Sequence, residues 1–212
     1  SGWQTAWALL ALDKSTSASE TSGRTAAWLL SVELLDVESD EMQAGNDTLG
    51  IDFSLRGWPW LPGQATWVEP TALAMLALSS VSRSPAITGR LAEAVRYLID
   101  RRCHGGGWNV GNPIMFSKPL PARAGPTAWA VLALLRLAPE AILLKDLSTL
   151  RSRANEENSV GALAWALLAL RATKSDVGGL ANRLEKLQAD DGSWNGNPYD
   201  TGVALLAFGG EL

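Results

Sequence analysis

The strongest constraint on this chain is an eight-residue motif that occurs five times. The copies align without gaps at Thr5–Leu12 (TAWALLAL), Thr71–Leu78 (TALAMLAL), Thr127–Leu134 (TAWAVLAL), Leu163–Leu170 (LAWALLAL) and Thr201–Phe208 (TGVALLAF). Every copy has alanine at its fourth and seventh positions and a large apolar residue at its eighth. Four copies begin with threonine, which is favoured near helix starts. Self-similarity of this kind indicates a repeat protein in which one helical unit recurs.

The motif segments contain no charged residue, so each predicts a helix that is surrounded by protein on all sides. Amphipathic stretches lie between them. In the clearest, residues 87–101, Leu91, Val95 and Leu98 share one face and charged residues occupy the other. This alternation predicts an all-α fold with two layers and about nine or ten helices, in a single domain over residues 1–212. An α/α toroid and an open α-solenoid both fit it.

Composition and charge exclude several classes of protein. The net charge of −4 and the lack of any run of Lys or Arg give no basis for nucleic-acid binding. The single cysteine, Cys103, excludes an intrachain disulfide. No membrane-spanning apolar stretch or signal peptide is visible, so we expect a cytoplasmic protein, with peripheral membrane contact and oligomeric state left open. Helix-like sequence from Trp3 nearly to Leu212 also fits a piece of a longer chain.

Two inserted segments predict where a site would lie. Successive motif copies start 66, 56, 36 and 38 residues apart, so the first two intervals contain extra chain. The inserts are residues 36–67, acidic and then rich in Gly, Pro and Trp, and residues 103–125, rich in Gly, Asn and Pro. Both lead into the N-terminal end of a motif helix. Because long ordered loops often carry function, we predict a site at the mouth formed by these helix N-termini.

The turns before the motif helices carry a family resemblance. Residues 187–194 (LQADDGSW) resemble the Gln-x-x-x-Gly-x-Trp turn of squalene and hopene cyclases, residues 102–108 (RCHGGGW) are a looser copy, and residues 57–60 (GWPW) are a further relic. The motif helices resemble those of the same cyclases, of protein prenyltransferase β subunits and of bacterial prenyltransferase/squalene-oxidase-repeat proteins. The resemblance implies an α/α toroid of inner and outer helices. It also implies that Trp108 and Trp194 stabilise helix ends.

The cyclase resemblance also implies two candidate catalytic residues. Class II terpene cyclases carry an Asp-x-Asp-Asp-Thr-Ala motif at the start of an inner helix, and its middle Asp protonates an alkene or epoxide. Aligning Thr71 and Ala72 with the motif's Thr-Ala places Glu69 at the proton-donating position, and the other carboxylates of the motif are absent. Asp200, just before Thr201, is an auxiliary candidate. Alternatively, Glu69 is an acidic residue favoured by the helix dipole, and Asp200 is an N-cap.

Aromatic and polar residues near the predicted mouth are candidates for ligand binding. Trp58, Trp60 and Trp67 lie on the first insert, His104 lies on the second, and Tyr199 precedes the last motif copy. The zinc-binding Asp-x-Cys and His of prenyltransferases have no counterparts here. His104 is adjacent to the lone cysteine, and Asp100 is the only carboxylate shortly before them, which does not make a zinc site. We therefore expect no metal and no cofactor.

Two functions fit these observations. The first is a terpenoid cyclase-like protein, of isomerase or lyase type if it is an enzyme, that binds a polyprenyl or triterpenoid-type apolar ligand in a central cavity. The second is a toroid without catalysis that binds a lipid or a protein partner. A prenyltransferase is disfavoured because the zinc ligands are missing. A thioester protein is excluded because no Cys-Gly-Glu-Gln string occurs.

Overall fold

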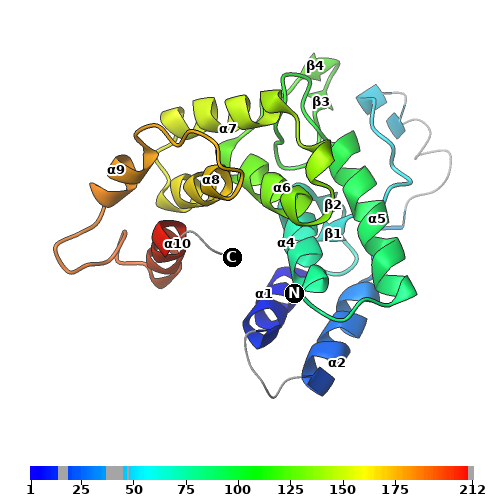
Figure 1. Cartoon of the computed structure of the whole chain (residues 1–212). Helices are drawn as coiled ribbons and strands as arrows, with labels where there is room; N and C mark the ends of the chain where they lie inside the picture. Colours follow the sequence, from blue (N-terminus) through cyan, green and yellow to red (C-terminus); the bar gives the residue numbers. More distant parts are fainter. Residues whose placement is uncertain (14–18, 37–44, 47, 210–212) are drawn as a thin grey trace.

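The computed structural model describes residues 1–13, 19–36, 45–46 and 48–209 and is mostly helical, which confirms the all-α prediction (Figure 1). The helices are α1 (Gly2–Asp13), α2 (Ser19–Leu30), α4 (Val68–Ser79), α5 (Pro85–Asp100), α6 (Ala124–Leu137), the 3-10 turn η1 (Pro139–Ala141), α7 (Leu144–Glu156), α8 (Val160–Ala172), α9 (Leu180–Glu185) and α10 (Pro198–Gly209). The short strands are β1 (Trp58–Pro59), β2 (Thr66–Trp67), β3 (Ile114–Met115) and β4 (Lys118–Pro119). Within the described ranges, no helix is long and apolar enough to cross a bilayer.

The helices form an inner and an outer row. Helices α1, α4, α6, α8 and α10 pack against one another in that order along an arc, and each contains one copy of the eight-residue motif (Figure 1). Helices α2, α5, α7 and α9 lie outside them, each against an inner helix that is its neighbour in the chain. The predicted alternation of buried and amphipathic helices is therefore present.

Small residues let the inner helices approach closely. Ala74, Ala130 and Ala166, all at the fourth motif position, are at most 1% exposed. Alanine at a helix contact permits axes at the short end of the usual range of about 8–10 Å. Large apolar residues such as Leu78 and Leu134, at the eighth position, are fully buried beside them. Each buried leucine contributes about 1.5–3 kcal/mol, so the inner row supplies much of the stability.

Three tryptophans form the same hydrogen-bonded clasp between an outer helix and the next inner helix. Each indole N–H donates to a leucine carbonyl in the outer helix, and each backbone N–H donates to the threonine hydroxyl of the motif. The clasps join Trp58 to Leu29 (2.8 Å) and Thr71 (2.7 Å), Trp108 to Leu98 (2.6 Å) and Thr127 (2.9 Å), and Trp194 to Leu184 (2.7 Å) and Thr201 (3.0 Å). Trp108 and Trp194 thus stabilise helix ends, as the resemblance implies. Trp58, only 1% exposed, does the same rather than lining a ligand cavity, contrary to the prediction.

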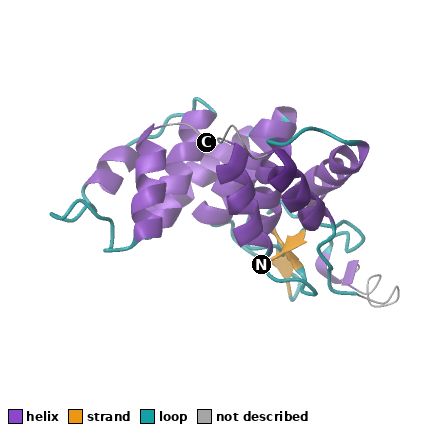
Figure 2. Cartoon of the chain, turned by 90° about the horizontal axis from the view of Figure 1, so that it is seen from below, coloured by secondary structure: helices purple, strands orange, loops and turns teal. Residues whose placement is uncertain are grey.

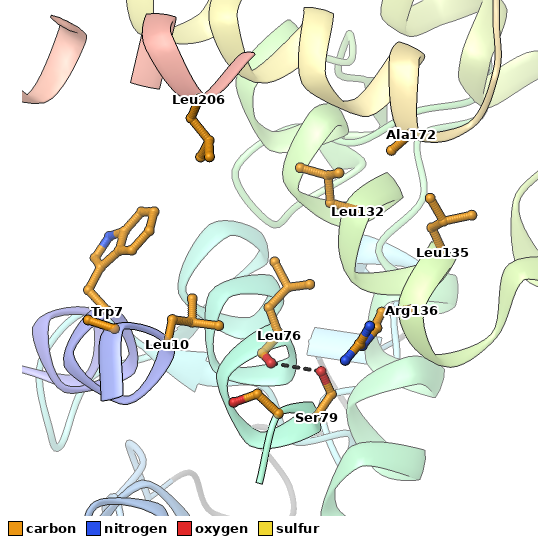
Figure 3. Close-up of a pocket in the computed structure, with 11 residues that line it drawn as sticks. Trp7, Leu10, Leu76, Ser79, Leu132, Leu135, Arg136, Ala172 and Leu206 are labelled. Atoms are coloured by element: carbon orange, nitrogen blue, oxygen red, sulfur yellow. Dashed lines mark hydrogen bonds between the residues drawn. The ribbon is translucent and has the colours of Figure 1, made fainter. Parts of the chain in front are cut away.

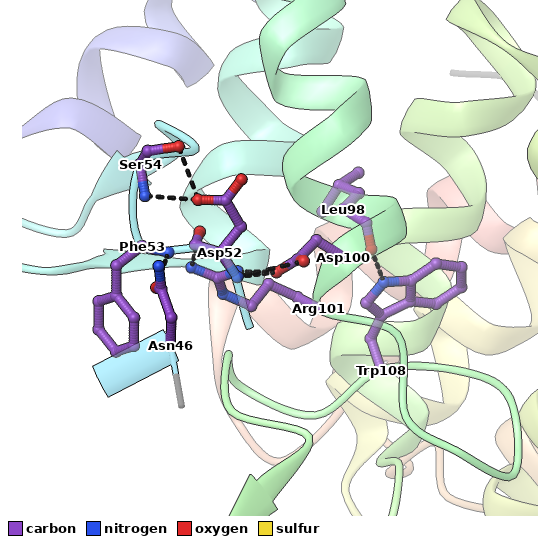
Figure 4. Close-up of polar contacts among 8 residues, drawn as sticks. All are labelled: Asn46, Asp52, Phe53, Ser54, Leu98, Asp100, Arg101 and Trp108. Carbon is purple, nitrogen blue, oxygen red and sulfur yellow. Dashed lines mark hydrogen bonds and ion pairs between the residues drawn. The ribbon is translucent and has the colours of Figure 1, made fainter. Parts of the chain in front are cut away.

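The described parts of the two inserts meet at the N-terminal ends of α4 and α6. Strand β1 pairs with β2 in one insert, β3 pairs with β4 in the other, and both hairpins lie at the same end of the helical rows (Figure 2). The backbone N–H of Val68 donates to the carbonyl of Val110 at 3.0 Å, which joins the inserts. Asp100 and Arg101 anchor the first insert at the backbone of Asp52 (Figure 4). Residues 37–44 and 47 of that insert lie outside the described residues.

Candidate functional site

The inward surface of the inner helices has four tiers, because side chains spaced i, i+4, i+7 and i+11 share one helix face. On α4, Glu69, Leu73, Leu76 and Ser80 occupy these positions from the N-terminal end to the C-terminal end. Equivalent residues define the mouth tier (Trp3, Glu69, Gly125, Gly161, Tyr199), the tryptophan tier (Trp7, Leu73, Trp129, Trp165, Val203), the leucine tier (Leu10, Leu76, Leu132, Leu168, Leu206) and the rim tier (Ser80, Arg136, Ala172).

Three indoles fill the interior at the tryptophan tier. The ring centroids of Trp129 and Trp165 are 4.0 Å apart, and the ring of Trp7 lies 5.8 and 5.9 Å from them. Trp7 belongs to α1 and Trp165 to α8, so this contact crosses the interior of the arc. Each such aromatic pair contributes about 0.5–1.5 kcal/mol beyond its burial. The tryptophan tier therefore packs the interior and holds α1 against distant helices of the inner row.

An apolar cavity of about 580 Å³ lies beside the tryptophan tier, toward the C-terminal ends of the inner helices (Figure 3). Trp7 lines one end of it. Four residues of the leucine tier also line it, namely Leu10, Leu76, Leu132 and Leu206. Small-molecule sites are typically concave, mostly apolar and about 300–1,000 Å³ in volume. The leucine-tier cavity has these properties.

The rim of the leucine-tier cavity is polar. Ser79 and Ser80 lie there at the end of α4, and their hydroxyls donate to carbonyls of their own helix at 2.7 and 2.8 Å. Arg136, in the last turn of α6, is exposed and also lines the cavity. The described lining residues therefore form an apolar chamber with Arg136 as the cation at its opening.

Glu69 lies at the opposite end of the interior, in the first turn of α4. Burial raises the pKa of its carboxyl group, and the Arg123 guanidinium offsets part of this effect. A β-carbon added at Gly125 would lie 3.6 Å from Glu69 Oε1, an ordinary van der Waals distance, so the carboxyl group lies beside the first turn of α6. The described residues supply no hydrogen bond to that carboxylate. Glu69 therefore keeps its proton to a higher pH than an ordinary glutamate does.

Tyr199 and Asp200 lie at the same mouth. The Tyr199 hydroxyl accepts a hydrogen bond from Trp165 Nε1 at 3.1 Å, and its pKa is raised by burial and, less strongly, by the charge of Glu69. The Asp200 carboxylate accepts a hydrogen bond from Asn195 Nδ2 at 3.0 Å. A β-carbon added at Gly161 would lie 3.2 Å from Asp200 Oδ1. The structure therefore gathers three of the predicted site residues in one place.

The tryptophan tier separates this mouth from the leucine-tier cavity. Glu69 and Leu76 are seven residues apart on α4, or about 10 Å along the helix axis. Trp129 and Trp165 occupy the intervening level, and Trp165 also bonds to Tyr199. Neither Glu69 nor Tyr199 lines the cavity. A ligand in the cavity would therefore contact Trp7 and not the candidate acid.

The other predicted ligand-binding residues are dispersed. The indole of Trp60 is 37% exposed and lies against Trp3, with ring centroids 6.3 Å apart. Trp67 lines a second cavity of about 690 Å³, which lies mostly along the first insert and whose wall also includes charged residues such as Arg56 and Arg101. His104 is exposed and lines neither cavity. Among Trp58, Trp60 and Trp67, only Trp67 lines either cavity.

Nothing in the described ranges forms a metal centre, since no three His, Cys, Asp or Glu residues there lie close enough to hold an ion. Cys103 is buried, and burial raises the pKa of its thiol.

Sequence reasoning missed the leucine-tier cavity. The inserts direct attention to the helix N-termini, whereas the cavity lies toward the C-termini. The motif itself contains a signal for this cavity. Its sixth residue is leucine in every copy and lies on the same helix face as the third residue, which points inward. No protein-family model matches the chain, and no curated protein matches it at a significant level.

Proposed function

We propose that this protein is a repeat protein of the α/α toroid type that binds an isoprenoid or another long apolar chain in the leucine-tier cavity. The apolar cavity itself, lined by Trp7 and leucines of four inner helices, is the observation that carries the proposal. Transfer of a hydrocarbon chain from water into such a cavity is favourable by about 25 cal/mol per Å² of apolar surface buried. The tryptophan clasps and the two rows of helices support the resemblance to cyclases and prenyltransferases.

Binding without acid catalysis fits this geometry best. Protonation of an alkene requires the acid to reach the reacting carbon directly or through one water. Glu69 lies on the far side of the tryptophan tier from the cavity, and its carboxylate lacks the neighbouring carboxyl groups of the cyclase motif. The ligand is therefore held rather than cyclised.

Adjacent leucines of α10 provide a matched test. Leu206 lines the cavity, whereas the side chain of Leu205 is 58% exposed. Leu206→Trp should fill the cavity and weaken binding of tritiated farnesol at least about tenfold in equilibrium dialysis, which corresponds to 1.4 kcal/mol. Leu205→Trp introduces the same side chain on the surface and should bind like the wild type. Absence of farnesol binding to the wild type, or equal binding by both variants, would contradict the proposal.

Acid catalysis by Glu69 is a second candidate function, favoured by the burial that raises its pKa. In this case the substrate would enter at the mouth tier, with Asp200 as the auxiliary carboxylate. Incubation with squalene and analysis of products by mass spectrometry tests it. Glu69→Gln should abolish product formation, and Glu93→Gln, on the outer helix α5, should not. Lack of product with the wild-type protein would exclude this candidate.

A further inference from the structure

Arg136 differs from the residues that correspond to it in neighbouring helices. The rim tier has serine in α4 (Ser80) and alanine in α8 (Ala172), so the two inner helices that flank α6 have no cation at this level. Among the described residues that line the leucine-tier cavity, Arg136 is the one with a charged side chain. Its guanidinium lies on the cavity side of α6, near Ser79 (Figure 3).

A comparison with Arg171 shows that the guanidinium N–H groups of Arg136 have no hydrogen-bond partner among the described residues. Arg171, in the last turn of α8, donates to the carbonyls of Ala207 and Phe208 at 2.6 and 3.1 Å and so joins the ends of two inner helices. Arg136 makes no hydrogen bond or ion pair with any residue in the described ranges. A cation in the last turn is favoured by the helix dipole, but this effect uses none of the five guanidinium N–H groups.

The structure therefore points to a ligand with an anionic head group. On the basis of the proposed function, we infer that the ligand is a long-chain monocarboxylate whose apolar tail fills the leucine-tier cavity and whose carboxylate pairs with Arg136. A planar guanidinium binds a carboxylate through two parallel N–H···O bonds. The hydroxyl hydrogens of Ser79 and Ser80 are already donated to carbonyls, so among the described rim residues Arg136 is the main donor.

Charge favours a monoanion over a diphosphate. Helices α4 and α6 both present C-terminal ends at this rim, and each end carries about half a negative charge. One arginine can balance a single carboxylate against this background, but not the several charges of a diphosphate. The tail would then point toward Trp7, and the head group would lie at the end of the interior that is far from Glu69.

Three probes that differ in the head group test this inference. Hexadecanoate, hexadecanol and farnesyl diphosphate are titrated at pH 8 and low salt into the wild type, Arg136→Gln, Arg136→Lys and Arg24→Gln. Arg24 is an exposed cation on the outer helix α2 and serves as the charge-matched control. The wild type and Arg24→Gln should bind hexadecanoate at least about tenfold more tightly than hexadecanol. Arg136→Gln should bind the two equally, with unchanged affinity for hexadecanol, and Arg136→Lys should retain part of the preference.

Other outcomes would refute the role of Arg136, the monocarboxylate ligand or the apolar site. Equal affinity of the wild type for acid and alcohol, or a preference that survives in Arg136→Gln, refutes the role of Arg136 while leaving the apolar site intact. Tighter binding of farnesyl diphosphate than of hexadecanoate, if lost in Arg136→Gln, refutes the monocarboxylate. Failure of all three probes and of farnesol refutes the proposed function itself.

Discussion

Replacement of Thr127 with valine tests whether the tryptophan clasps hold the two rows of helices together. Thr127 is fully buried, and its hydroxyl accepts a hydrogen bond from the backbone N–H of Trp108 at 2.9 Å and donates to the Trp108 carbonyl at 3.0 Å. Valine has the same shape but makes neither bond. The Trp108 carbonyl would keep the hydrogen bond from the backbone N–H of Arg123 at 2.8 Å, whereas the Trp108 N–H would lose its partner.

The structure sets the magnitude of this effect. A buried donor without a partner costs about 1–3 kcal/mol, and Trp108 is fully buried, so we expect a loss of about 2 kcal/mol in the free energy of unfolding. Thr201→Val removes the corresponding bond to Trp194, but that bond is only partly buried and water can replace it. The cost there should be about 0.5–1 kcal/mol.

Thermal unfolding followed by circular dichroism at 222 nm distinguishes the two variants. For a chain of this length, a change of 1 kcal/mol shifts Tm by about 2–4 °C, so Thr127→Val should lower Tm by about 4–8 °C and Thr201→Val by about 1–4 °C. Equal shifts in Tm for the two variants would show that the burial of a clasp does not determine how much the clasp contributes to stability. A Thr127→Val protein as stable as the wild type would refute the clasp as a stabilising element.

Three further predictions use the same unfolding assay. Because burial raises the pKa of Glu69, its contribution to stability is complete below the ordinary value of 4.5 and is lost as pH rises through the folded-state pKa. The Tm of Glu69→Gln minus the Tm of the wild type should therefore increase as the pH is raised from about 4 to about 7. A Tm difference that does not change with pH would contradict this prediction. Asp146→Asn should cost about 3 kcal/mol, because the fully buried carboxylate accepts a hydrogen bond from the Gly107 N–H at 2.8 Å and pairs with Arg102 at 3.2 Å; a loss below about 1 kcal/mol would contradict it. Gly192→Ala, at φ +85° with open space around it, should cost about 1–2 kcal/mol, and Gly107→Ala, at φ +70° with the nearest atom 2.9 Å from the added carbon, should cost clearly more; equal losses would contradict the steric argument.

The local pattern was sufficient to predict the five motif helices, and it predicted burial on all sides correctly for α4, α6 and α8. It was wrong for the end helices α1 and α10, where residues such as Ala8 and Leu205 are exposed, because each has a neighbouring inner helix on only one side. A charge-free motif predicts a helix surrounded by protein, and the five copies became α1, α4, α6, α8 and α10. The role of Trp108 and Trp194 was also predictable, because their turns resemble a known stabilising device. Glu69, Tyr199 and Asp200 were candidates because each lies just before a motif copy in the sequence, and in the structure they lie in the first turns of α4 and α10.

The tertiary structure alone decided which parts of the interior are filled and which are empty. The contact between Trp7 and Trp165 joins helices that are far apart in the chain. It forms because small rotations between successive helix pairs add up and bend the inner row into an arc. A local sequence pattern does not contain these rotations. The same curvature leaves the cavity beside Leu206 and places the tryptophan tier between that cavity and Glu69. Helix periodicity thus determined which face of each inner helix points inward, and the packing of the rows determined what those faces meet.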